Sequence, residues 1–158
     1  LHFFSSSTGS GSSHSHTEYL DPTLRITEGM AVLGPEIPAK TQAMADKMFG
    51  MMGGDIGRFL LDKITGGLGE EAQGLRTVQG EGPGTLMASP GAETALDDLR
   101  FGPGLANARV GRNGARRPIV MRGPFGLRVR LPYKLNKPDD IEAFIRLGRA
   151  LSDNLRNA

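Results

Sequence analysis

The sequence predicts an α+β chain with three parts: an N-terminal Met-rich helical segment, a long extended Gly/Pro-rich connector, and a small C-terminal β-hairpin plus helix unit. Three observations support this prediction. Apolar residues recur every four positions between residues 38 and 65, which indicates a helix. Gly and Pro supply 15 of the 52 residues in 66–117, a proportion typical of extended chain. Residues 118–157 show an alternating apolar pattern followed by a helical one.

Residues 1–21 are expected to form a Ser/Gly-rich N-terminal tail. Residues 1–17 contain seven Ser and no Lys, Arg, Asp or Glu. Mitochondrial and chloroplast presequences are Ser-rich and poor in acid, so this segment resembles the distal end of such a presequence after its Arg-bearing part is removed. A linker left from cloning, or a chain recorded only from a later residue, would also explain a start without methionine. The first interpretation predicts a mitochondrial protein.

Residues 22–65 are expected to form a helical segment, with a short hairpin at most in front of it. The runs LRIT and MAVL are β-like, but Glu28-Gly29 between them is a poor hairpin turn. Pro38 suits the first turn of a helix. The apolar stripe that follows has two interpretations, a helical core packed with adaptable methionines or a partner-binding face. Its members are Met44, Met48, Met52, Ile56, Leu60 and Ile64.

Residues 66–117 are expected to form the extended connector. One short helix is predicted inside it at SPGAETALDDLR, with Ser89 as its N-cap and Pro90 in its first turn. A connection of this length is unusual in a compact domain. It is expected of a subunit whose chain runs across its neighbours.

Residues 118–158 are expected to form the hairpin-helix unit. PIVMR meets a turn at GPFG, after which apolar residues alternate with Arg128 and Arg130, so one face of the strand is apolar and the other cationic. Residues 136–157 then follow a helical pattern, and Gly148 in the middle of the helix allows close contact with a neighbouring element.

Charge is distributed unevenly along the chain. Residues 1–99 carry 6 basic and 13 acidic side chains, whereas residues 100–158 carry 13 basic and 4 acidic ones. Such a dipolar chain suits docking between surfaces of different sign, although the two halves could also neutralise each other. The sequence has no window of 18 apolar residues, so no transmembrane span is expected.

Residue types that support catalysis are scarce, so the sequence predicts a protein that is not an enzyme. The chain has no Cys, and its three His all lie in the tail. Ser89 and Ser152 are the serines outside the tail, and neither lies in a nucleophile-elbow sequence. No glycine-rich loop completes a nucleotide-binding pattern. We therefore expect no catalytic residue, no cofactor and no metal site.

The basic stretch between residues 109 and 137 is the feature with the most functional weight. Arginine forks bind carboxylates and phosphates in a bidentate way, so acidic protein surfaces, anionic lipid head groups and RNA are all conceivable ligands. RNA ranks below the first two because aromatic residues are few in this stretch: Phe125 lies in the turn and Tyr133 on the apolar face, so a platform for base stacking is missing. The alternative is an ordinary solvated face. The candidate partner-binding residues are Arg109, Arg112, Arg116, Arg117, Arg122, Arg128, Arg130 and Lys134.

Taken together, these features predict a structural accessory subunit of a mitochondrial multiprotein complex, either the respiratory chain or ATP synthase. The subunit would bridge neighbouring subunits on the matrix side or at the periphery of the inner membrane. The alternative is a mitochondrial ribosomal protein that contacts rRNA through residues 109–137. The net charge of +2 favours the first, because proteins that coat phosphates need an excess of cations.

Overall fold

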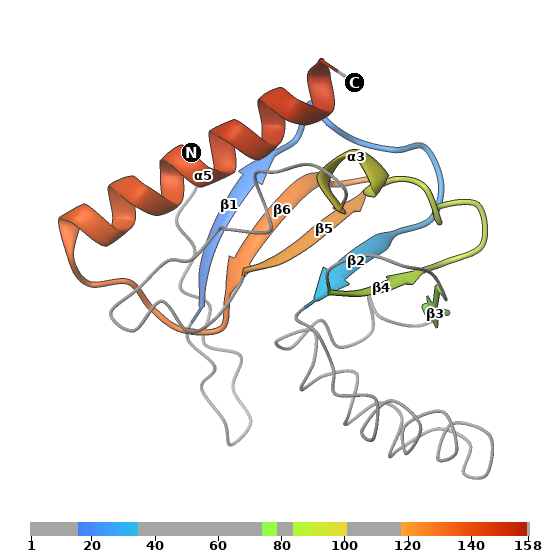
Figure 1. Ribbon diagram of the computed structural model, residues 1–158, viewed down its shortest axis with the longest axis horizontal. Coiled ribbons are helices and arrows are strands. Elements are labelled where there is room, and N and C mark those ends of the chain that lie inside the picture. The colour runs from blue at the N-terminus through green and yellow to red at the C-terminus, as the bar shows by residue number, and fades with distance from the viewer. Residues whose placement is uncertain (1–15, 35–73, 79–83, 101–117, 158) are drawn as a thin grey trace, which may run out of the picture.

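The computed structural model describes residues 16–34, 74–78, 84–100 and 118–157 (Figure 1). The expected Met-rich helix at 38–65 lies outside these residues, as does much of the connector. The described part is a mixed α+β fold, in agreement with the predicted fold class.

Six strands form one antiparallel sheet in the order β1-β6-β5-β2-β4-β3. The hairpin of β5 and β6 lies beside β1 and β2, so strands from both ends of the chain meet in the sheet (Figure 1). The strand bounds are β1 Thr17–Asp21, β2 Ala31–Gly34, β3 Arg76–Thr77, β4 Thr85–Ala88, β5 Ile119–Gly123 and β6 Gly126–Leu131.

The predicted C-terminal hairpin is confirmed as β5 and β6, joined by Pro124 and Phe125. Gly126 closes the turn with φ +106°, a conformation that L side chains rarely adopt. A Cβ at this position would also lie 2.7 Å from the Cα of Pro22. The hairpin does not stand apart as a small unit, because β6 pairs with β1 and β5 pairs with β2.

The N-terminal expectations need two corrections. Residues 17–21, placed in the tail, form the strand β1 and pair along its whole length with β6. The prediction of a short hairpin between LRIT and MAVL is wrong, because β2 pairs with β4 and β5. Residues 24–27 form no strand; instead, the amide of Ile26 donates a hydrogen bond to the Gly123 carbonyl at 3.1 Å. Partners distant in sequence thus replace the weak local turn.

The described parts of the connector also belong to the sheet. They contain β3, β4 and the four-residue helix α3, Asp97–Arg100. Ser89 is not an N-cap. Its hydroxyl accepts a hydrogen bond from the Met30 amide at 2.6 Å and donates one to the Met30 carbonyl at 3.2 Å. The serine therefore joins the end of β4 to the start of β2, and the expected helix is shorter than SPGAETALDDLR.

The predicted C-terminal helix is confirmed as α5, Pro138–Arg156. Proline is tolerated in its first turn because the N–H it lacks has no helical partner there. Asp139 and Asp140 lie in the first turn and Arg156 in the last, so the charges oppose the helix dipole. Its buried face is formed by Phe144, Gly148, Leu151, Ser152 and Leu155.

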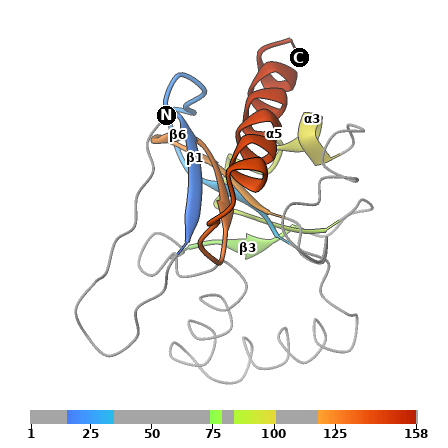
Figure 2. The ribbon, with the colours of Figure 1, turned by 90° about the vertical axis from the view of Figure 1, so that its left-hand side faces the viewer.

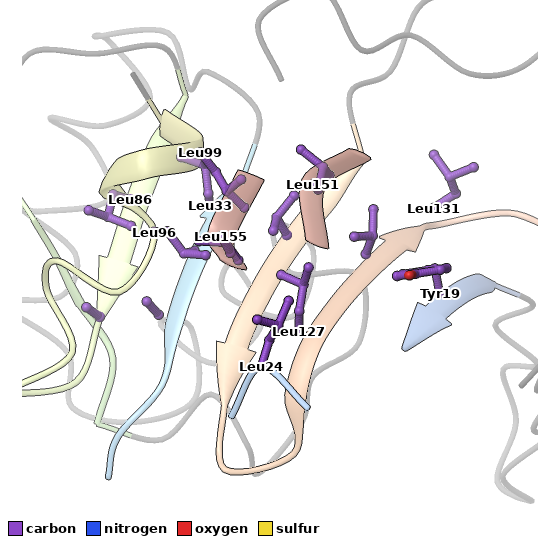
Figure 3. Packing of buried hydrophobic residues seen from close by; sticks show 14 of the residues in the cluster. Tyr19, Leu24, Leu33, Leu86, Leu96, Leu99, Leu127, Leu131, Leu151 and Leu155 are labelled. Carbon is purple, nitrogen blue, oxygen red and sulfur yellow. The ribbon is translucent and has the colours of Figure 1, made fainter. Parts of the chain in front are cut away.

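Both described helices cover the same face of the sheet (Figure 2). The core between these layers joins Leu96 and Leu99 from the α3 region, Leu151 and Leu155 from α5, and side chains of five strands (Figure 3). Gly148 permits the close contact expected of it: a Cβ there would lie 2.6 Å from Cδ1 and Cδ2 of Tyr19 on β1. The aromatic ring therefore lies directly against the backbone of α5.

Candidate functional site

The three arginines of the hairpin lie on two different faces of the sheet. Arg122 is paired with Leu127 in the β5–β6 register, and Leu127 belongs to the core under the helices. The Arg122 guanidinium donates from Nε to the Leu24 carbonyl and from Nη1 to the Ala95 carbonyl, each at 3.0 Å. Arg122 thus ties the loop after β1 to the segment before α3, and it lies away from the other two arginines.

Arg128 and Arg130 lie on the opposite face, as the alternation along β6 predicts. Arg130 donates to one Glu18 oxygen from both Nε and Nη2, at 2.9 and 2.7 Å. Glu18 is the residue directly opposite Arg130 on β1. The side chains are 9% and 10% exposed, so this pair is largely shielded from water. A large part of the Arg130 charge is therefore engaged within the sheet.

Arg128 contacts Glu18 and Phe125 on the same face. Its Nε lies 3.9 Å from the other Glu18 oxygen, and its guanidinium carbon lies 4.0 Å from the centroid of the Phe125 ring. The stacked geometry is that of a cation–π contact. The Phe125 ring is thereby covered on one side by a residue of the same hairpin.

Of the other candidate residues, one is an exposed lysine and four are arginines that the structure does not describe. Lys134 is exposed in the connection between β6 and α5. The remaining four, Arg109, Arg112, Arg116 and Arg117, lie outside the described residues. The structure thus brings Arg128 and Arg130 together, separates Arg122 from them, and leaves Lys134 at the surface.

Sequence reasoning missed a polar network between β1 and α5. A hydrogen bond of 3.2 Å joins the hydroxyls of Tyr19 and Ser152, and Ser152 is completely buried. Asp21 forms an ion pair with Arg156 from the last turn of α5. It also accepts hydrogen bonds from the hydroxyl and the amide of Thr23, at 2.6 and 3.0 Å. The sequence signal was the alternation in TEYLD, which places the Thr17, Tyr19 and Asp21 positions on one side of a strand.

The network keeps Asp21 ionised although its side chain is only 7% exposed. Burial by itself would raise its pKa. The Thr23 hydroxyl and amide, the Ser152 hydroxyl and the positive charge of Arg156 outweigh that effect, so the pKa of Asp21 lies below its ordinary value of 3.8. The carboxylate is held in its charged form by the hydrogen bonds from Thr23, next to β1, and by Ser152 and Arg156 of α5.

This arrangement stabilises the fold and presents no accessible nucleophile at Ser152, whose exposed fraction is zero. Among the described residues, no group of three or more His, Cys, Asp or Glu side chains could hold a metal ion. No helix within those same ranges is long and apolar enough to cross a membrane.

The chain matches no protein-family model, and no curated protein or solved structure shows significant similarity to it.

Proposed function

We propose that this chain is a non-catalytic structural accessory subunit of a mitochondrial multiprotein complex, of the respiratory chain or ATP synthase, and that it bridges neighbouring subunits. The observation that supports the proposal is that the polar side chains around β1 form contacts with α5. Tyr19 and Asp21 of β1 both form hydrogen bonds with Ser152 of α5, and these bonds fasten the helix to the sheet. These contacts stabilise a scaffold, and the fully buried Ser152 hydroxyl is out of reach of a substrate.

Acidic surfaces of neighbouring proteins are the proposed partners of the basic stretch. Lys134 is exposed at the start of the segment that leads into α5, and it has the freedom to contact a carboxylate outside the chain. RNA is the weaker alternative. The Phe125 ring, which would be needed to stack on a base, already has the Arg128 guanidinium 4.0 Å from its centroid.

The first experiment follows the endogenous protein in mild-detergent extracts of mitochondria separated on a native gel. Co-migration with an inner-membrane complex, unchanged by nuclease, is the expected result. Release by nuclease, or co-migration with ribosomal particles, would support rRNA binding and reject the respiratory or ATP synthase assignment.

A second experiment tests whether the basic stretch makes the contact. The double variant Arg116→Glu/Lys134→Glu should lose co-migration, because it replaces two positive charges at the proposed interface by two negative ones, a net change of four units. The matched control is Arg146→Glu/Arg149→Glu, which makes the same charge change on the exposed side of α5. Equal loss of co-migration in both variants would contradict a specific role for the basic stretch.

A further inference from the structure

The connection between β6 and α5, residues 132–137, is tied to the sheet by one side chain of β1 (Figure 1). The Thr17 hydroxyl donates a hydrogen bond to the Tyr133 carbonyl at 3.0 Å and accepts one from the Leu135 amide at 2.9 Å. Thr17 is 3% exposed, and Leu135, at 7%, belongs to the core under the helices. The backbone on both sides of Lys134 is therefore fixed. We refer to residues 132–137 as the β6–α5 loop.

Lys134 and Lys137 are the basic residues of the β6–α5 loop, and both are exposed. Among the residues that the structure describes, neither lysine forms an ion pair. Arg130, near the end of β6, is in contrast paired with Glu18. The charges of the two lysines are thus available to a group outside the chain.

Lys137 occupies a position that does not suit a lysine. It is the N-cap of α5, with extended backbone angles of φ −97° and ψ 133°, and its side chain forms no capping hydrogen bond. Ser, Thr, Asp and Asn are preferred at an N-cap, because their side-chain oxygens accept hydrogen bonds from the first amides of the helix. A positive charge is also unfavourable at the positive end of the helix dipole. Residues that break such local preferences are typical of functional sites.

We propose that the β6–α5 loop docks a carboxylate of a neighbouring protein, with Lys134 and Lys137 as the contact residues and Thr17 as the residue that positions Lys134. A lysine on a fixed backbone loses less conformational freedom on binding than a lysine on a mobile one. The two hydrogen bonds of Thr17 therefore prepare the loop for the contact before the partner arrives.

A protein carboxylate fits the β6–α5 loop better than the phosphates of RNA. Asp139 and Asp140 lie just after the loop, in the first turn of α5. A single carboxylate that projects from a partner can reach the lysines and stay away from these acids. Successive phosphates of RNA would bring further negative charge close to them. The inference rests on the proposed bridging role and deepens it by naming the contact.

Zero-length cross-linking with a carbodiimide tests the contact, because this reagent joins a lysine amine to a carboxylate only where the two groups touch. Permeabilised cells that contain the natural protein are treated, and the cross-linked peptides are mapped by mass spectrometry. Lys134 or Lys137 joined to an Asp or Glu of another protein is the expected result. Cross-links from these lysines only to carboxylates of the same chain, or no cross-link from either, would overturn the inference.

The identity of the cross-linked protein separates this inference from the proposed function. A partner from a respiratory-chain complex or ATP synthase supports both, whereas a partner from outside mitochondria supports the contact and rejects the proposed function. Lys134→Gln/Lys137→Gln should lower the amount of co-purifying partner several-fold. Arg146→Gln/Arg149→Gln, which removes the same charge from the exposed side of α5, should not lower it. Equal amounts of partner with the two variants would contradict docking at the β6–α5 loop.

The positioning role of Thr17 has its own test. Thr17→Val keeps the shape of the side chain without the hydroxyl, so it should lower the yield of the Lys134 cross-link several-fold, and Thr17→Ser should restore it. Acetylation of Lys134 by an N-hydroxysuccinimide ester should proceed at the same rate in all three chains, because it reports exposure and not direction. An unchanged cross-link in Thr17→Val would refute the role. If Thr17→Val does not fold, exchange of the Leu135 amide in the natural chain decides: slow exchange supports the role, and fast exchange refutes it.

Discussion

The contact between Gly148 and Tyr19 leads to the sharpest prediction about stability. In an unconstrained helix, Gly148→Ala would stabilise the chain by about 1 kcal/mol, because alanine is the better helix former. Here the new Cβ would lie 2.6 Å from two ring carbons of Tyr19, closer than real Cβ contacts occur. The ring cannot simply move away, since its hydroxyl is bonded to the buried Ser152.

The expected magnitude follows from these opposing effects. Overpacking of a core typically costs about 1–3 kcal/mol, and loss of the Tyr19–Ser152 hydrogen bond adds about 1 kcal/mol. After the gain in helix propensity is subtracted, Gly148→Ala should lower the free energy of unfolding by about 2 kcal/mol. The sign, opposite to that expected from propensity, is the decisive quantity.

Urea unfolding followed by far-UV circular dichroism measures this change, since the chain has no Trp to report by fluorescence. The control is Ala150→Gly at an exposed position of α5, which should cost about 1 kcal/mol from propensity alone. In a Tyr19→Ala background, Gly148→Ala should become neutral or stabilising. The reasoning is refuted if Gly148→Ala is as stable as the natural chain, or if its effect does not depend on Tyr19.

Three further predictions concern the polar contacts of β1. Ser152→Ala should lower the free energy of unfolding by about 1–2 kcal/mol, because it leaves the Tyr19 hydroxyl without its partner, whereas the exposed Asn154→Ala should change it by less than about 0.5 kcal/mol. Because the pKa of Asp21 is depressed, its contribution to stability is present above pH 3.8 and is lost as the pH falls below that value. Urea midpoints measured across this range should therefore depend less on pH in Asp21→Asn than in the natural chain. An unchanged dependence would contradict the contribution assigned to Asp21. Glu18→Gln should lower the free energy of unfolding in urea by about 3 kcal/mol, because it leaves Arg130 buried without its counter-charge. The double variant Glu18→Leu/Arg130→Leu should lower it clearly less. An equal loss in both variants would show that packing, not charge, determines stability at this pair.

Elements set by local patterns could be predicted from the sequence. The GPFG turn between alternating strands predicts the β5–β6 hairpin, and the apolar repeat of 136–157 predicts α5. Gly148 was identified as a point of close contact, although its neighbour was not. Each of these features depends on residues that are near one another in the chain, so a short window contains the information needed.

The candidate site was predictable only in part. Alternation along β6 correctly places Arg128 and Arg130 on one face of the sheet, whereas β5 presents Arg122 to the other side, which the sequence pattern did not indicate. The tail boundary also failed at Thr17–Asp21, a strand whose partner is more than a hundred residues away. The partner-binding role of these arginines stays a prediction.

By itself, the sequence determined the α+β class, the C-terminal hairpin and helix, and the uneven distribution of charge and methionine. The tertiary structure alone decided that β1 pairs with β6 and that Glu18 forms an ion pair with Arg130. It also decided that the Tyr19 ring lies against Gly148 and that its hydroxyl is hydrogen-bonded to Ser152. The physical reason is the range of the interactions. Turns and amphipathic periods act over a few residues, whereas strand order and buried polar pairs depend on which distant segments share a core.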